Sequence, residues 1–93
     1  MITVTLKAYA TLRDILGKEL RLTLPRGTTV GSLLNDLAGR YPALRGKLLD
    51  DDGAVGQYFI VLKNGRNILF AGGLDALLED GDSLSLFPPV AGG

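Results

Sequence analysis

The chain has 93 residues, of which 46% are hydrophobic, and its ten Lys and Arg residues are balanced by ten Asp and Glu residues. This length predicts one domain with one modest core, and the absence of cysteine and histidine excludes disulfides, thiolate metal sites and a histidine general base. The charges are scattered and no apolar run approaches the ~20 residues of a membrane span, so we expect no nucleic-acid partner, no membrane association and a cytoplasmic location.

The first part of the chain predicts a strand, a short helix and a second strand. Hydrophobic and polar residues alternate over residues 1–8 and again over residues 20–24, which is typical of half-buried strands. Between these segments, helical spacing is shared by Tyr9, Leu12, Ile15 and Leu16. Gly17 is expected to close this short helix, and the Pro-Arg-Gly sequence of residues 25–27 predicts a turn.

A longer amphipathic helix is predicted over residues 30–40. Thr28 or Thr29 is a suitable N-cap, because a hydroxyl can accept a hydrogen bond from a free N–H group of the first turn. The apolar stripe of this helix consists of Val30, Leu33, Leu34, Leu37 and Ala38. Tyr41-Pro42 should end the helix, since the residue before a proline avoids the helical conformation.

The middle of the chain predicts an irregular segment followed by a hairpin. Residues 42–57 have no clear periodicity, and we expect their leucines to hold a largely irregular segment against the core. Residues 58–63 are apolar enough for a central strand that is buried on both faces. Asn64-Gly65 is a strong hairpin signal, and residues 66–70 are expected to form the return strand.

The last strand is expected over residues 83–87. A short helical turn near residues 74–78 and a polar turn over residues 79–82 should precede it. A helix with one apolar stripe must cover the apolar face of a sheet. The predicted fold class is therefore α+β, a roll in which a mixed sheet packs on one main helix.

The final six residues have the composition of an extended tail and consist of Pro88, Pro89, Val90, Ala91, Gly92 and Gly93. The prolines should stop the sheet ladder and keep the tail off the sheet, because proline fixes φ and lacks a backbone donor. We therefore expect a domain over residues 1–87 and a flexible tail over residues 88–93, which reaches ~20 Å when extended. A frayed end is the simpler alternative, but the double proline, the preceding strand and the terminal glycines together favour a tail that can thread a narrow channel.

Two motifs and the order of the predicted elements carry a family resemblance. Residues 9–17 (Tyr-Ala-Thr-Leu-Arg-Asp-Ile-Leu-Gly) are similar to the aromatic-Ala-x-x-Arg-acidic-x-x-Gly stretch of MoaD proteins. Asp80-Gly81-Asp82 precedes a strand, and residues 87–93 (Phe-Pro-Pro-Val-Ala-Gly-Gly) are close to the MoaD consensus. The whole chain thus resembles the MoaD and ThiS sulfur carriers, which implies the ubiquitin-like β-grasp fold, and it looks closest to MoaD, the small subunit of molybdopterin synthase.

The resemblance implies that Gly93 is the reacting residue. In this family an adenylating enzyme of the MoeB or ubiquitin-activating type uses ATP to adenylate the C-terminal carboxylate, and a sulfur donor then converts it into a thiocarboxylate. Gly92 would give the tail its freedom, while Val90 and Ala91 would contact the channel of a MoaE-like large subunit. The sulfur would enter molybdopterin, for a molybdenum or tungsten cofactor. The chain would be a sulfur-donating subunit with no catalytic side chain, no metal and no permanently bound cofactor.

Phe70 and Phe87 are candidates for a docking surface beyond the tail, with simple core or edge packing as the competing explanation. Residues 42–57 and 70–74 look more like the longer members of the family, some of which serve cysteine biosynthesis and some of which modify proteins. Two alternatives therefore remain, a ubiquitin-like modifier of the small archaeal type, joined through Gly93 to lysines of target proteins, and a sulfur carrier for cysteine or other thio-metabolites. A plain adaptor domain that binds through its sheet is a further alternative.

Overall fold

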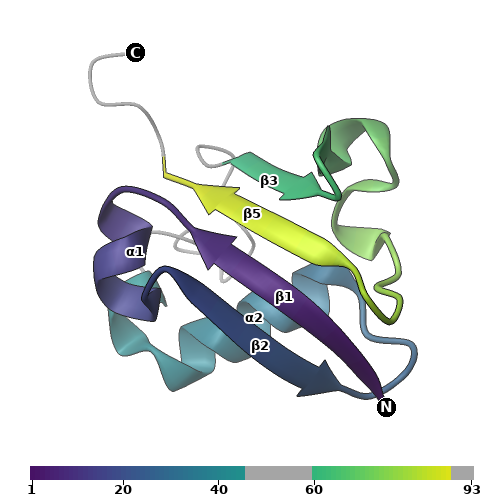
Figure 1. The fold of residues 1–93 in the computed structure, drawn as a ribbon, viewed down its shortest axis with the longest axis horizontal. Helices are drawn as coiled ribbons and strands as arrows, with labels where there is room; N and C mark the ends of the chain where they lie inside the picture. Colours follow the sequence, from purple (N-terminus) through teal and green to yellow (C-terminus); the bar gives the residue numbers. More distant parts are fainter. Residues whose placement is uncertain (46–59, 89–93) are drawn as a thin grey trace.

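The computed structural model describes residues 1–45 and 60–88, and within them one five-stranded sheet has the strand order β2-β1-β5-β3-β4 (Figure 1). In chain order the strands are β1 (Ile2–Ala8), β2 (Glu19–Leu24), β3 (Ile60–Lys63), β4 (Arg66–Asn67) and β5 (Ser83–Phe87). The central pair, β1 and β5, is parallel, and the other neighbouring strands are antiparallel. The expected mixed sheet is therefore confirmed.

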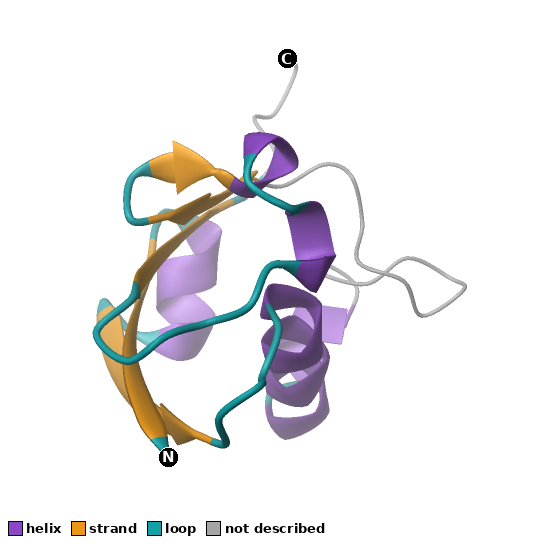
Figure 2. Cartoon of the chain, turned by 90° about the vertical axis from the view of Figure 1, so that its right-hand side faces the viewer, coloured by secondary structure: helices purple, strands orange, loops and turns teal. Residues whose placement is uncertain are grey.

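Both α-helices lie on the same side of this sheet, as Figure 2 shows. The shorter helix is α1 (Thr11–Leu16), which Gly17 closes as expected, and the main helix is α2 (Val30–Arg40). Thr29 is the N-cap of α2, because its Oγ1 accepts a hydrogen bond of 3.1 Å from the backbone N–H of Ser32. The helix ends at Tyr41, in front of the proline, as predicted.

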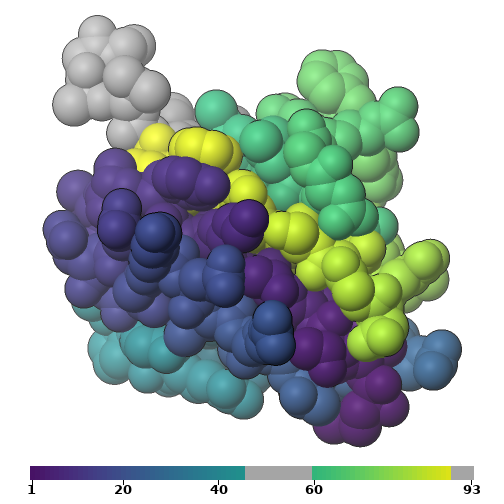
Figure 3. Space-filling model, in the orientation of Figure 1, coloured from purple at the N-terminus to yellow at the C-terminus, as the bar shows by residue number. Residues whose placement is uncertain are grey.

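The core forms between the inner face of the sheet and the apolar stripe of α2. All five residues predicted for this stripe are buried, and so are the alternate residues of the two central strands: Ile2, Val4, Leu6 and Ala8 of β1, with Leu84 and Leu86 of β5. The residues between them point to the other side, where no helix covers the sheet in the part of the chain that the structure describes (Figure 3). The α+β roll with one main helix is thus confirmed.

The hairpin after Ile60 is shorter and more exposed than the sequence predicts. Asn64 and Gly65 both have positive φ values, 52° and 84°, which is the expected tight turn. The return strand stops at Asn67, because the Asn67 side chain accepts a hydrogen bond of 2.9 Å from Leu69 N–H and starts a 3₁₀ turn over Ile68–Phe70. The prediction of a strand over residues 66–70 was therefore wrong beyond its second residue.

The prediction that β3 is buried on both faces was also wrong. Val61 is buried, but Ile60 is 44% exposed, because its side of the sheet carries no second layer within the described residues. Of the leucines predicted to hold the irregular segment, Leu44 is fully buried in a 3₁₀ turn (Pro42–Leu44), while Leu48 and Leu49 lie outside the described residues.

The connection between β4 and β5 contains less helix than expected. A 3₁₀ turn covers only Gly73–Asp75, while Leu78 is buried and Leu77 is 57% exposed. The polar turn before β5 forms as predicted, with Asp82 N–H donating to the Glu79 carbonyl at 3.0 Å. Among residues 1–45 and 60–88, no helix combines the length and the apolar character needed to cross a membrane.

Candidate functional site

The predicted tail leaves the sheet from its central strand. β5 lies between β1 and β3 and ends at Phe87, directly before the half-buried Pro88, where the sequence predicts the end of the ladder. The remaining candidate residues, Pro89, Val90, Ala91, Gly92 and Gly93, lie outside the described residues. The structure therefore defines the base of the tail. The surface around Phe87 is the part of the domain nearest to any partner that encloses the tail.

Tyr9 stacks on Phe87 at this base. The two ring centroids are 4.4 Å apart and the ring planes differ by 7°, so the rings are nearly parallel. Tyr9 N–H also donates to the Leu86 carbonyl at 3.2 Å, which continues the ladder between β1 and β5 by one residue. The interpretation of Tyr9 as part of the α1 stripe was wrong, because Ala10, with φ 53° and ψ −129°, turns the chain between Tyr9 and the helix.

Ile60 extends this aromatic pair across a third strand. It is paired with Phe87 in the register of β3 and β5, and both side chains lie on the uncovered face of the sheet. Tyr9 is 39% exposed and Ile60 44%. We call Tyr9, Phe87 and Ile60 the tail-base row. Sequence reasoning found only Phe87, since the other two follow from a register between strands far apart in the chain.

Phe70, the second predicted docking residue, lies away from this row. It sits in the 3₁₀ turn after β4 and is 80% exposed, beside Leu69, which is 78% exposed. These values exclude core packing as the explanation for Phe70. Phe87 is half-buried, and its stacking on Tyr9 shows that it packs and is accessible at the same time.

A buried carboxylate fixes the register that forms the tail-base row. Asp82 is 8% exposed, and its two oxygens accept hydrogen bonds from the Asn64 side-chain amide at 2.9 Å and from Glu79 N–H at 2.8 Å. Lys63 Nζ lies 3.7 Å from the same carboxylate, and Asn64 Oδ1 accepts from Ser83 N–H at 2.9 Å. These contacts connect the β3–β4 hairpin to the start of β5. They thereby fix the register of β3 against β5, in which Ile60 faces Phe87 at the other end of the two strands.

The described residues offer little chemistry of their own. Across residues 1–45 and 60–88, no group of three or more acidic side chains comes together to hold a metal ion. The sequence contains no cysteine and no histidine as a nucleophile or base. The described residues instead form the base of the predicted tail, where β5 ends at the stacked Phe87 and Pro88 follows.

Curated relatives share most of the chain. It is 42% identical over 89 residues to small archaeal modifier protein 3 of Haloferax volcanii, covering 95% of this chain and 96% of that protein. It is also 33% identical over 69 residues to the sulfur carrier protein CysO of Mycobacterium tuberculosis, covering 72% and 74% of the two chains. Both relatives therefore match this chain across at least two thirds of their length.

Solved structures share the fold. The crystal structure of SAMP1 from Haloferax volcanii superposes with a TM-score of 0.83 at 35% identity and covers 98% of this chain and 99% of that one. A putative molybdopterin converting factor, subunit 1, from Pyrococcus furiosus superposes with a TM-score of 0.77 at 28% identity, covering 97% of this chain and 100% of the other. The architecture is thus that of the ubiquitin-like β-grasp proteins.

The matching region of the family includes both the tail-base row and the glycine tail, since residues 6–93 match the ThiS family. With a β-grasp fold and with modifiers and sulfur carriers as relatives, the chain belongs to the ThiS family, in the ThiS/MoaD group of ubiquitin-like sulfur carriers.

Proposed function

We propose that this chain is a cytoplasmic protein modifier of the small archaeal kind, whose Gly93 carboxylate is activated and then joined to lysines of target proteins. The observation that carries the proposal is the 42% identity to small archaeal modifier protein 3, which extends over 95% of this chain. This replaces molybdopterin synthesis as the leading interpretation, because two modifier relatives show 42% and 38% identity, whereas the molybdopterin converting factor shows 28%.

The chemistry requires activation by a second protein. An α-carboxylate has a pKa of about 3.3–3.7, so near neutral pH Gly93 is anionic and a poor electrophile. An adenylating enzyme of the ubiquitin-activating type would catalyse attack of a carboxylate oxygen on the α-phosphorus of ATP, with pyrophosphate leaving. A lysine amine of the target then attacks the acyl carbon, AMP leaves and an isopeptide bond forms. Sulfide-level sulfur that attacks the acyl carbon instead displaces AMP and gives the thiocarboxylate.

The tail has the dimensions that this chemistry needs. Residues 88–93 extend at most ~20 Å from the end of β5, far enough to place Gly93 inside another protein while the domain stays outside. The two glycines add no side chain to the width of the segment, so it can occupy a channel that excludes larger residues. Pro88 and Pro89 keep the segment from pairing with a strand. The tail-base row would meet the partner at the mouth of this channel.

Sulfur donation is the second candidate function. It is favoured by the similarity to CysO, a sulfur carrier, and by the structural similarity to a putative molybdopterin converting factor. In that case the thiocarboxylate of Gly93 would supply sulfur to a thio-metabolite or, with a MoaE-like large subunit, to molybdopterin. Both functions need the same adenylate, so one protein can serve both.

The test is to recover the protein from its native cell with a tag at Met1. This residue is 75% exposed and precedes the start of β1, whereas the other end of β1 lies beside the end of β5 at Phe87. Modification predicts a set of higher-mass conjugates in which Gly93 is joined to lysines of other proteins. Sulfur carriage predicts an intact mass that differs by the exchange of one oxygen for one sulfur at Gly93. The recovered material is analysed without reducing agents, by intact mass and by mapping of branched peptides.

A variant that lacks Gly92 and Gly93 is the control. Conjugates that persist in this variant would not be formed through Gly93 and would contradict the proposal. Thiocarboxylate without conjugates would replace it with the sulfur-carrier function. An unmodified terminus in cells, and also after incubation with ATP and cell extract, would leave the adaptor alternative.

A further inference from the structure

A cationic hollow lies beside the tail-base row and has no assigned role. Its volume is about 220 Å³, and it is lined by Lys7 and Ala8 of β1, by Tyr9 and Arg13, by Lys18 before β2 and by Glu19, the first residue of β2. We call it the basic hollow. It shares Tyr9 with the tail-base row, so the two features form one continuous surface around the start of the tail.

The charge of the basic hollow contrasts with that of the whole chain. The chain has ten cations and ten anions, whereas the hollow has three cations and one carboxylate. Glu19 is the cross-strand neighbour of Lys7, but within residues 1–45 and 60–88 neither Lys7, Arg13 nor Lys18 has an ion pair within 4.0 Å. Lys63 and Arg40, in contrast, are paired with carboxylates.

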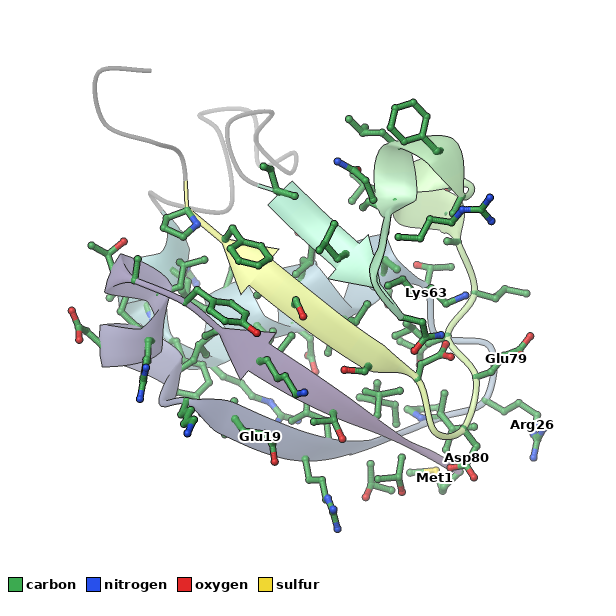
Figure 4. All side chains as sticks on the ribbon, turned by 45° about the horizontal axis from the view of Figure 1, so that its top comes forward. Met1, Glu19, Arg26, Lys63, Glu79 and Asp80 are labelled. Atoms are coloured by element: carbon green, nitrogen blue, oxygen red, sulfur yellow. The ribbon has the colours of Figure 1, made fainter. Side chains whose placement is uncertain are left out.

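The opposite end of the sheet has no excess of positive charge in its hollow. Figure 4 shows Arg26, Glu79, Asp80 and Met1 gathered there, well away from Glu19 on β2. A larger hollow of about 470 Å³ lies among these residues, with two carboxylates and one arginine in its lining. Of these two hollows, the one with an excess of positive charge thus lies at the end of the sheet from which the tail departs.

We propose that the basic hollow binds an acidic segment of the adenylating enzyme that activates Gly93, an inference that rests on the proposed function. A partner that encloses Gly93 must come within ~20 Å of Phe87, because the tail is no longer than that. A partner surface that extends from Gly93 to Phe87 also meets Tyr9, which stacks on Phe87 and lines the basic hollow together with the three cations. Carboxylates at that place complement the hollow, whereas an uncharged surface would bury the cations without a partner.

The expected contribution is to association and not to the chemical step. Single exposed ion pairs are weak, but charges at the rim of an interface raise the association rate and make it depend on salt. The basic hollow is close to the base of the tail and distant from an extended Gly93. Substitutions in it should therefore raise the KM for this protein in the adenylation reaction and leave kcat unchanged.

The experiment compares two charge-matched variants of the full chain as substrates of the ubiquitin-activating-type enzyme from the same organism. Lys7→Glu/Lys18→Glu reverses the net charge of the basic hollow from positive to negative. Arg26→Glu/Arg66→Glu makes the same change in net charge elsewhere on the exposed surface. Pyrophosphate release gives KM and kcat at several salt concentrations. We expect the first variant to raise KM about tenfold at low salt with unchanged kcat, and the control to stay within about twofold.

High salt should raise the KM of the wild-type protein and reduce its difference from Lys7→Glu/Lys18→Glu, because screening removes the same interaction. Lys7→Gln/Lys18→Gln should give an intermediate KM, and thermal unfolding checks that each variant is folded.

Equal KM values for the two charge-matched variants would overturn the inference. So would a short RNA that binds through Lys7 and Lys18 while the KM stays unchanged. A wild-type protein that is not adenylated at all would instead overturn the proposed function.

Discussion

Asp82 shows how one side chain connects the hairpin to the central strand. It is nearly buried and accepts hydrogen bonds from Asn64 and from Glu79 N–H, while Lys63 supplies a nearby positive charge. Removing the carboxylate leaves two donors in a partly buried place without an acceptor, which costs more than the loss of the bonds alone. The residue thus stabilises the fold and, through the register of β3, the position of Ile60.

Asp82→Ala is expected to lower the free energy of unfolding by about 2–3 kcal/mol, because the Asn64 amide and Glu79 N–H lose their acceptor. Urea unfolding followed by circular dichroism measures this change. Asp75→Ala is the matched control, since Asp75 is exposed, and it should change stability by less than about 0.5 kcal/mol. Equal effects of the two substitutions would show that the buried carboxylate has no special part in stability.

Ala10 holds Tyr9 in the tail-base row at an energetic cost. Its φ of 53° with ψ of −129° lies in a region that glycine adopts easily and alanine does not. Ala10→Gly should therefore stabilise the protein by about 1 kcal/mol, because the relief of strain exceeds the added freedom of the unfolded chain. Thermal unfolding tests this, with Ala43→Gly as an exposed control that should not be stabilised. A loss of stability in Ala10→Gly would mean that the turn is unstrained.

The fate of Tyr9 and Phe87 shows where residue-level prediction succeeds and fails. Phe87 could be recognised because the motif of an apolar residue before Pro88 is local in the sequence. Tyr9 could not, because its spacing to Leu12 fits a helix, and only the turn at Ala10 and the pairing of β1 with β5 place it on the outer face. The sequence shows neither the strained dihedral angles nor the register.

At the level of elements, α2 is the part that the sequence predicts best. Its five-residue stripe, its threonine cap and the proline after its end all indicate the same segment, and such agreement between local signals is what makes a helix predictable. The prediction for β4 was too long, because the Asn67 side chain accepts a hydrogen bond from Leu69 N–H and starts a 3₁₀ turn in place of further strand pairing. The basic hollow was also beyond prediction, since its residues come from β1, α1 and the start of β2.

The two glycines of α2 have different surroundings and allow a controlled test of helix packing. A Cβ added at Gly31 would lie 3.1 Å from Leu74 Cβ and 3.2 Å from the Leu74 carbonyl oxygen, whereas one added at Gly39 would meet nothing within 4 Å. Gly39→Ala should raise the free energy of unfolding by about 0.5–1 kcal/mol, because alanine favours the helix. Gly31→Ala should fall short of this gain by about 1 kcal/mol or more, since the turn over residues 73–75 must move.

Equilibrium unfolding of both variants measures this difference. Equal stabilisation by the two substitutions would show that α2 and the 73–75 turn can separate without cost. A larger side chain, as in Gly31→Leu, should be clearly destabilising for the same steric reason, whereas Gly39→Leu should be tolerated on the exposed face of the helix.

At the level of the whole molecule, we expect the domain to determine stability and the tail to determine reactivity with the activating enzyme. Deleting Gly92 and Gly93 should change the free energy of unfolding by less than about 0.5 kcal/mol, because the core lies within residues 2–86. The same deletion should abolish adenylation in the pyrophosphate assay. Differential scanning calorimetry provides the first measurement. A large loss of stability would mean that the tail packs on the domain and that the boundary at residue 87 is wrong.

The position of β5 has a consequence for synthesis of the protein on the ribosome. This strand is made last of the five, yet it occupies the middle of the sheet, between the first strand and the hairpin. β1 can pair with β2 early, but its second neighbour, β5, is almost a full chain length away in the sequence. Pairing over such a distance slows folding. A nascent chain interrupted before Ser83 lacks β5 and the terminal glycines, and such an incomplete sheet leaves apolar residues and strand edges exposed. Under the proposed function, the reacting Gly93 is therefore present only after β5 has been synthesised in full.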